Sequence, residues 1–175
     1  EALGAFVRAL RGLDATDAPA PGRHNFGRGE PIRVRDAVTR SAIANLAGEI
    51  DAGTALKVWD EALAARDWDG PPTWLHGDLM PGNLIVAGGR LDAVIDFGGL
   101  AAGDPAVDLM PAWAVFEGPA RDAFRDAAGL DAAAWWRGRA WALHAGVMAL
   151  PYYRDSRPSF AAFARRMIEA AVGAD

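Results

Sequence analysis

Apolar residues recur at every third or fourth position along most of this chain of 175 residues, which is the spacing of amphipathic helices. The first stretch shows this pattern, since Leu3, Phe6, Val7 and Leu10 fall on one helical face. Between residues 14 and 34 the chain is rich in proline and glycine without a sustained period, so we predict a long loop there. The pattern predicts helices over residues 1–13, 36–50, 54–68, 105–116, 118–128, 131–150 and 158–172.

The period changes between residues 73 and 96, where short apolar runs are separated by polar residues and glycines. The runs TWLHGD, NLIVA and LDAVID are typical of strands, and the two glycines between the last two runs predict a tight hairpin turn. The expected fold class is therefore mainly α with a small β-hairpin (α+β), formed as a single domain over residues 1–175.

A two-residue turn at residues 88–89 fixes the register of the predicted hairpin, with residue 87 opposite residue 90. Asn83 then lies opposite Val94, and Asp96 lies diagonal to Asn83 on the same face. The other face is apolar, and we expect it to pack on the core: Leu84, Val86, Leu91, Ala93 and Ile95.

The predicted register brings oxygen ligands together at the open end of the hairpin. An amide oxygen from Asn83 and a carboxylate from Asp96 suit Mg²⁺, which prefers hard oxygen ligands. Asp78 precedes the hairpin, and a carboxylate there can accept the proton of an alcohol during phosphoryl transfer. Aspartate and asparagine are also common in turns, which is the simpler interpretation of each residue alone. Their convergence favours a phosphotransfer site.

Composition narrows the class of protein. The formal net charge of −5 argues against binding to nucleic acids or anionic membranes. The chain has no cysteine, which excludes disulfides and thiolate metal sites and fits a reducing, cytoplasmic compartment. The uncharged run at residues 140–153 is too short to span a bilayer, and we expect a buried helix there. No signal peptide opens the chain, and Glu1 begins inside a predicted helix, so we expect a fragment of a longer protein.

Three segments occur in an order known from one enzyme family. The segments HGDL with a following asparagine at 76–83, IDFG at 95–98 and GDPAVDL at 103–109 resemble the C-terminal lobe of the aminoglycoside phosphotransferase family. That family has the protein-kinase fold, and protein kinases carry the related pattern His-Arg-Asp and Asp-Phe-Gly. Gly77 stands where those kinases have arginine, which favours the small-molecule branch.

The resemblance implies a role for each matching position. Asp78 resembles the catalytic base, and His76 resembles the histidine that orients the catalytic loop. Asn83 and Asp96 resemble the Mg²⁺ ligands that bind the nucleotide through its phosphates, and Asp108 resembles the acid that braces the loop. The implied reaction transfers the γ-phosphoryl group of ATP or GTP to a hydroxyl of an aminoglycoside or another small alcohol, with antibiotic resistance as one implied use.

The chain also departs from the family pattern. Met80 stands where members commonly have histidine, and Gly99 stands where many relatives have an acid, which bears on acceptor choice and loop rigidity. The sequence has no glycine-rich phosphate loop, and its only lysine, Lys57, lies in a predicted helix before the catalytic loop. We therefore expect this chain to lack the N-terminal nucleotide-binding lobe and to be inactive by itself. The alternative is a non-catalytic binding or regulatory module that keeps the same fold.

Several residues have a structural and a functional interpretation. His76 and His144 are better explained as hydrogen-bonded or buried structural histidines than as acids or bases, and Asp108 is equally well explained as a solvated acid. Helix packing explains the aromatic residues of the C-terminal half better than an acceptor pocket does: Trp135, Trp136, Trp141, Tyr152 and Tyr153. A solvated face explains four acids as well as an anionic surface for a polyamine does: Glu117, Asp122, Asp126 and Asp155.

Overall fold

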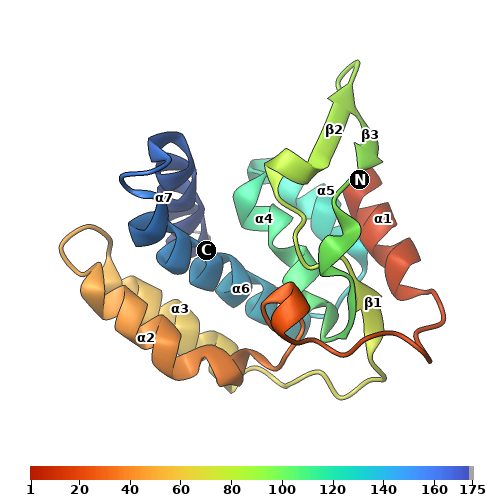
Figure 1. Cartoon of the computed structure of the whole chain (residues 1–175), viewed down its shortest axis with the longest axis horizontal. Helices are drawn as coiled ribbons and strands as arrows, with labels where there is room; N and C mark the ends of the chain where they lie inside the picture. The colour runs from red at the N-terminus through yellow and green to blue at the C-terminus, as the bar shows by residue number, and fades with distance from the viewer. Residues whose placement is uncertain (174–175) are drawn as a thin grey trace.

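The structure is a computed structural model that describes residues 1–173 (Figure 1). Its helices are α1 (Ala2–Arg11), α2 (Asp36–Asn45), α3 (Ala52–Ala64), α4 (Pro111–Ala114), α5 (Gly118–Ala128), α6 (Ala132–Tyr153) and α7 (Pro158–Val172). Its strands are β1 (Thr73–Leu75), β2 (Leu84–Ala87), β3 (Arg90–Val94) and β4 (Ala101–Gly103). The mainly α fold class with a small β-hairpin is confirmed. No helix within residues 1–173 is long and apolar enough to cross a membrane.

Helix α6 runs through the middle of the molecule and organises the helical body. It packs against α7 along its length and against α2 and α3 on another side, while α1 pairs with α5 (Figure 1). Glycines permit these close approaches, because a Cβ at Gly138 would lie 2.6 Å from the Cβ of Leu109. A Cβ at Gly146 would likewise lie 2.6 Å from Cγ1 of Ile168 in α7. A larger residue at either glycine would push the partner elements apart.

Helix boundaries differ from the predicted ones where proline or a cap decides them. The predicted helix over 105–116 is divided into a 3-10 helix at Pro105–Leu109 and the short α4, because Pro111 has no N–H to continue the hydrogen bonding. Helix α3 begins two residues earlier than predicted, where Asp51 accepts a hydrogen bond from the Thr54 amide at 3.0 Å. Helix α6 includes Pro151 and ends at Tyr153, three residues beyond the end of the predicted helix over 131–150.

The β-hairpin has the predicted turn, but its predicted register is wrong beyond the second pair. Residues 86 and 87 pair with 91 and 90, whereas Leu84 pairs with Val94 and Ile85 with Ala93. Asp92 is therefore an extra residue in β3, which is a β-bulge. Below the bulge the alternation of faces is reversed, so Asn83 does not lie opposite Val94.

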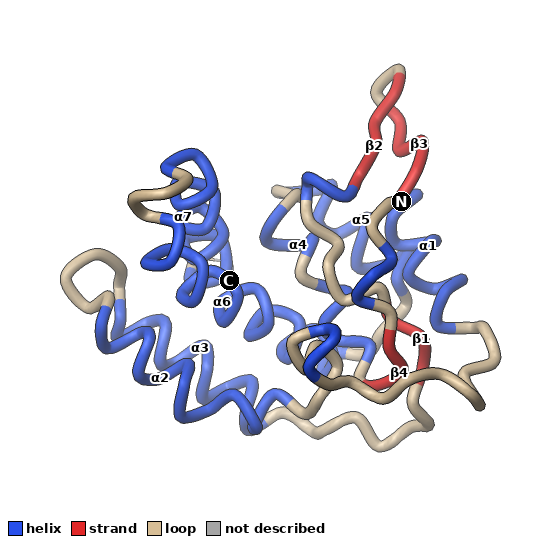
Figure 2. Tube along the Cα trace, in the orientation of Figure 1, coloured by secondary structure: helices blue, strands red, loops and turns tan. Residues whose placement is uncertain are grey.

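The predicted core face of the hairpin is confirmed only in part. The hairpin projects away from the helical body, with Val86 64% exposed and Ile95 41% exposed (Figure 1). Leu84 and Leu91 of the predicted face pack against the core, together with Val94, which the prediction did not include. A second antiparallel pair, between β1 and β4, was not predicted because Ala101, Ala102 and Gly103 have low strand propensity (Figure 2).

Candidate active site

The catalytic loop that follows β1 is held from beneath by one buried carboxylate. Asp108 is 2% exposed, and its Oδ2 accepts a hydrogen bond from the His76 amide while its Oδ1 accepts one from the Gly77 amide, both at 2.7 Å. Burial raises the pKa of the Asp108 carboxyl, although the two amide donors act in the opposite direction. This geometry excludes the solvated interpretation of Asp108 and favours the bracing one.

His76 connects the catalytic loop to the end of β3. The Asp78 amide lies 3.2 Å from Nδ1 of the ring and can only donate, so we assign the proton of the neutral ring to Nε2, which lies 3.0 Å from the Ile95 carbonyl. The residue is fully buried, and Phe97 meets its ring edge-on at 4.9 Å between centroids. Both ring nitrogens are occupied, so the position of His76 suits an orienting role rather than proton transfer.

Gly77 has a backbone conformation that other residues rarely adopt. Its φ is +78°, and a Cβ there would lie 3.4 Å from the carbonyl oxygen of Gly99. A Cβ at Gly99 would in turn lie 3.3 Å from the carbonyl oxygen of His76. The two glycines let the loops after β1 and after β3 pack backbone to backbone. The fold therefore disfavours an arginine at position 77.

Asp78 and Asn83 are hydrogen-bonded to each other across the turn of the loop. Asn83 lies in a 3-10 helix at Pro81–Asn83, and its Nδ2 donates to the Asp78 carbonyl at 2.8 Å and to Asp78 Oδ2 at 3.1 Å. The other oxygen of Asp78, Oδ1, lies 3.1 Å from Nη1 of Arg28. The sequence prediction missed Arg28, which lies 50 residues earlier in an irregular loop. Both carboxylate oxygens of Asp78 are thus oriented by donors.

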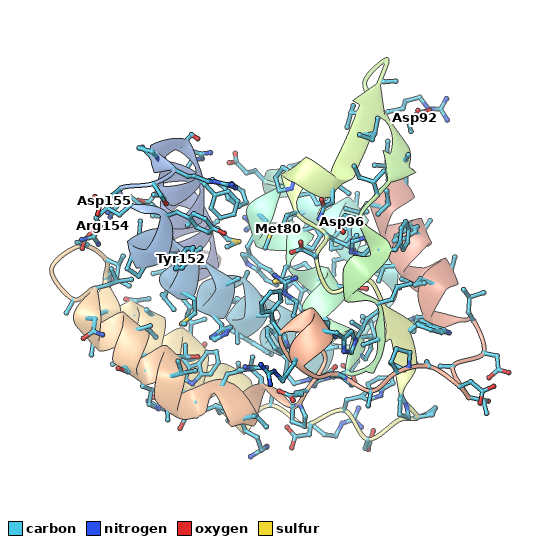
Figure 3. The ribbon with its side chains drawn as sticks, in the orientation of Figure 1. Met80, Asp92, Asp96, Tyr152, Arg154 and Asp155 are labelled. Carbon is cyan, nitrogen blue, oxygen red and sulfur yellow. The ribbon has the colours of Figure 1, made fainter. Side chains whose placement is uncertain are left out.

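Asp96 stands beside Asn83, although not by the predicted strand geometry. The Ile95 amide donates to the Asn83 carbonyl at 3.0 Å, and Asp96 follows with φ +63° and ψ 64°. Aspartate tolerates this left-handed conformation better than most residues, and here it turns the chain sharply out of β3. In the view of Figure 3, Asp96 is drawn at the root of the hairpin, while Asp92 lies out along the hairpin.

The side chains of Asn83 and Asp96 fit a magnesium ion. Oδ1 of Asn83 and the exposed carboxylate of Asp96 have no hydrogen-bond partner among residues 1–173, so both retain free oxygen lone pairs. The same part of the chain contains no cluster of three or more His, Cys, Asp or Glu residues that could hold a metal alone. Mg²⁺ commonly takes only one or two protein ligands and completes its shell with waters and phosphate oxygens.

The aromatic residues considered for an acceptor pocket do not form one cluster. Trp141 is 3% exposed, and Trp135 packs on Trp113 with 4.6 Å between ring centroids. Trp136 lies under the guanidinium of Arg139 at 5.2 Å. Tyr152 is 76% exposed, and Figure 3 shows it at the end of α6, apart from Asp96 at the root of the hairpin. Packing accounts for the tryptophans.

Three of the four acids considered for an anionic surface belong to one part of the fold. Asp122 and Asp126 lie in α5, and Glu117 is the N-cap of that helix. Asp155 follows α6 and lies at the far edge of the molecule in Figure 3. Asp155 therefore does not share a surface with the three acids at α5.

His144 is partly buried between aromatic rings. Its Nδ1 lies 2.8 Å from the hydroxyl of Thr39, and its ring meets Trp141 edge-on at 5.7 Å between centroids. Burial and the positive charges of Arg35 and Arg28 lower the pKa of His144 to about 4. The ring is therefore neutral near pH 7, as a structural histidine would be.

Comparison with known proteins identifies the family. Residues 1–144 match the phosphotransferase enzyme family, known as APH. The chain belongs to this family. No curated protein matches it significantly. The APH chain resembles a solved macrolide 2'-phosphotransferase type I with a TM-score of 0.54 and 19% identity, over 95% of this chain and 58% of that chain.

Two further solved structures resemble the APH chain. The apoenzyme of macrolide 2'-phosphotransferase MphH from Brachybacterium faecium has a TM-score of 0.51 and 24% identity, over 92% of this chain and 58% of that chain. ADP-bound aminoglycoside phosphotransferase APH(2'')-Ib has a TM-score of 0.48 and 17% identity, over 98% of this chain and 63% of that chain. The APH chain therefore spans less than two thirds of each of these solved relatives.

Proposed function

We propose that this chain forms the acceptor-side lobe of a small-molecule kinase, with Asp78 as the catalytic base. The observation that supports this most strongly is the orientation of Asp78. Asn83 holds one of its oxygens at 3.1 Å, Arg28 holds the other at 3.1 Å, and the Ile95 amide bonds to the Asn83 carbonyl, which brings the start of the Asp96 segment to the end of this loop. A turn would need none of these contacts, whereas phosphoryl transfer needs a carboxylate beside a metal.

In the proposed reaction, Asp78 orients an acceptor hydroxyl and takes its proton. The acceptor oxygen forms a bond to the γ-phosphorus of ATP or GTP, and the bond from that phosphorus to the bridging oxygen breaks to leave a nucleoside diphosphate. A magnesium ion held by Asn83 and Asp96 would neutralise charge on the phosphates. His76 and Asp108 would act indirectly, because they hold the loop that carries Asp78.

We further propose that the nucleotide-binding lobe is supplied by sequence outside these 175 residues. The chain spans 58% of the length of the two macrolide phosphotransferases that it resembles, and it contains neither a glycine-rich phosphate loop nor a strand lysine. The chain alone is therefore expected to show no turnover. The proposed acceptor is a hydroxylated small molecule. Macrolides are the first compounds to test because two solved relatives are macrolide phosphotransferases, and aminoglycosides follow because of the sequence resemblance described above.

The test is a turnover screen of the full-length protein that carries this chain. ATP or GTP and Mg²⁺ are supplied with hydroxylated antibiotics and metabolites, and nucleoside diphosphate release is measured with and without acceptor. Asp78→Asn is expected to abolish acceptor-dependent turnover without loss of the folded state, since a carboxamide cannot take the proton. Turnover that survives in Asp78→Asn would refute the assigned base. Nucleotide binding with no turnover on any acceptor would favour the non-catalytic module.

A further inference from the structure

The carboxylate of Asp78 is paired with an arginine that the reaction described above does not yet use. Nη1 of Arg28 lies 3.1 Å from Oδ1 of Asp78, and the side chains of Arg28 and Asp78 are 26% and 30% exposed. Asn83 donates to the other oxygen. With one donor on each oxygen, the plane of the carboxylate is fixed, and only its remaining lone pairs face an incoming hydroxyl.

Arg28 is delivered to this place by a loop built around one buried amide. Asn25 is 1% exposed, and its Oδ1 accepts hydrogen bonds from the amides of Gly22 at 2.9 Å and Gly27 at 3.1 Å. Its Nδ2 donates to the carbonyl of Arg28 at 2.8 Å. All three bonds of the Asn25 side chain are local, and the last one holds the backbone of Arg28 directly.

The same loop contains a strained residue that core packing does not explain. Phe26 has φ +58°, which is unfavourable for a bulky side chain, yet its ring is 75% exposed. The guanidinium of Arg28 lies 5.5 Å from the centre of that ring, and the Phe26 carbonyl accepts a hydrogen bond from Arg35 at 2.7 Å. Strain of this kind costs roughly 1–3 kcal/mol and is concentrated at functional sites. Here it places an aromatic platform beneath the arginine.

The loop is also attached to the segment that carries Asp96. Nε2 of His24 lies 3.2 Å from the carbonyl of Leu100, and the Asp104 amide donates to the carbonyl of Gly29 at 2.9 Å. Arg28 is therefore held between two attachments to the chain that follows β3. An exposed surface arginine in a long proline- and glycine-rich loop would have none of these constraints.

We propose that Arg28 is a positioning residue for the phosphoryl transfer proposed above, on which this inference rests: it fixes the Asp78 carboxylate so that one lone pair meets the acceptor hydroxyl. A free carboxylate would sample several orientations about χ2, and misplacement of a reacting group by about 1 Å can cost roughly 100-fold in rate. The arginine is expected to act on the rate of the chemical step, because its ion pair is with the carboxylate that takes the proton.

The experiment compares Arg28→Gln, Arg28→Lys and a matched control in the full-length protein. Arg33→Gln removes another ion-paired arginine close to Arg28 in the sequence, whose partner is Asp67 and not Asp78. Arg28→Gln is expected to lower kcat about 10- to 100-fold with an unchanged acceptor KM and melting temperature. Arg28→Lys is expected to recover part of the loss, since an ammonium can still reach one oxygen, and Arg33→Gln is expected to leave kcat unchanged.

Two results would overturn the role of Arg28. One is a kcat in Arg28→Gln that equals the control, and the other is a loss of kcat that matches a fall in melting temperature and is not recovered by Arg28→Lys. Asp78→Asn, measured alongside, separates the two proposals. If Asp78→Asn retains turnover, the proposed function fails, whereas its inactivity together with an unaffected Arg28→Gln would reject only the role of Arg28.

Discussion

Replacing Asp108 by asparagine removes the contact that fixes the catalytic loop to the core. The side chain keeps its shape, but one of its two oxygens becomes an NH₂ group that faces a backbone N–H. Either His76 or Gly77 then loses its acceptor in a site that is 2% exposed at Asp108. The change isolates the bracing role, because the side chain of Asp108 makes no other hydrogen bond among residues 1–173.

The expected loss of stability follows from the two hydrogen bonds of 2.7 Å that the Asp108 carboxylate accepts. A hydrogen bond to a charged group contributes about 1.5–3 kcal/mol, and a buried donor left without a partner costs about 1–3 kcal/mol. Relief from burying a charge offsets part of the sum, since burial already raises the pKa of this carboxyl. We expect Asp108→Asn to lower the free energy of unfolding by about 2–3 kcal/mol.

Urea unfolding followed by tryptophan fluorescence measures the global effect. With a urea m-value of about 2 kcal/mol/M, the midpoint should fall by about 1–1.5 M. Native-state hydrogen exchange measures the local effect, and the amides of His76 and Gly77 should lose about 30- to 160-fold in protection. The control is Asp122→Asn, the same substitution at an exposed position of α5, which should change neither quantity. The urea midpoint is measured with an error of roughly 0.2 M. If the midpoint of Asp108→Asn lies within that error of the control, and the exchange of both amides is unchanged, the bracing role is refuted.

Two further substitutions test a buried ion pair and the pH dependence of the chain's stability. Arg137 is 1% exposed and forms a bidentate pair with Asp104 at 2.7 and 3.1 Å, so Arg137→Met should destabilise the chain by about 3–5 kcal/mol in urea unfolding. Adding Asp104→Asn should recover part of that loss, and a double variant no more stable than the single one would contradict the idea of a stranded charge. His144 has a folded pKa of about 4, below its usual 6.5, so the unfolded chain binds its proton first as the pH falls. The stability that neutral His144 contributes should be fully present above pH 6.5, and the free energy of unfolding should be lower by about 2 kcal/mol at pH 5. The variant His144→Phe should not show this difference. An equal pH dependence in the variant would exclude His144 as its source.

Local sequence pattern predicted the helices well and the hairpin only in part. Periodicity located each long helix because one face of each must meet the core. The turn at residues 88–89 was correctly predicted, but a turn fixes register only as far as the first irregularity, and Asp92 is inserted two pairs from it. Strand β4 was missed because its pairing with β1, and not its own residues, makes it a strand.

The candidate site was likewise predictable only where its residues are close together along the chain. Asp78, Asn83 and Asp96 lie within a short segment, so their proximity was predictable even though the strand geometry used for it was wrong. The contact of Arg28 with Asp78 joins residues 50 positions apart, and no local pattern signals it. The only sequence signal for this contact was the pair of glycines that flank Arg28. In the structure, Gly27 and Gly29 both have positive φ.

The projecting hairpin acts mechanically as a lever whose pivot lies at the site. Asn83 and Asp96 stand at the root of the hairpin, where the Ile95 amide bonds to the Asn83 carbonyl and the Ile95 carbonyl lies 3.0 Å from the His76 ring. A force on the tip moves the tip far and the pivot little, because displacement about a pivot grows with distance from it. The oxygens suited to a metal therefore move little when the tip of the hairpin is displaced, while Asp78 follows a loop that Asp108 fixes to the core.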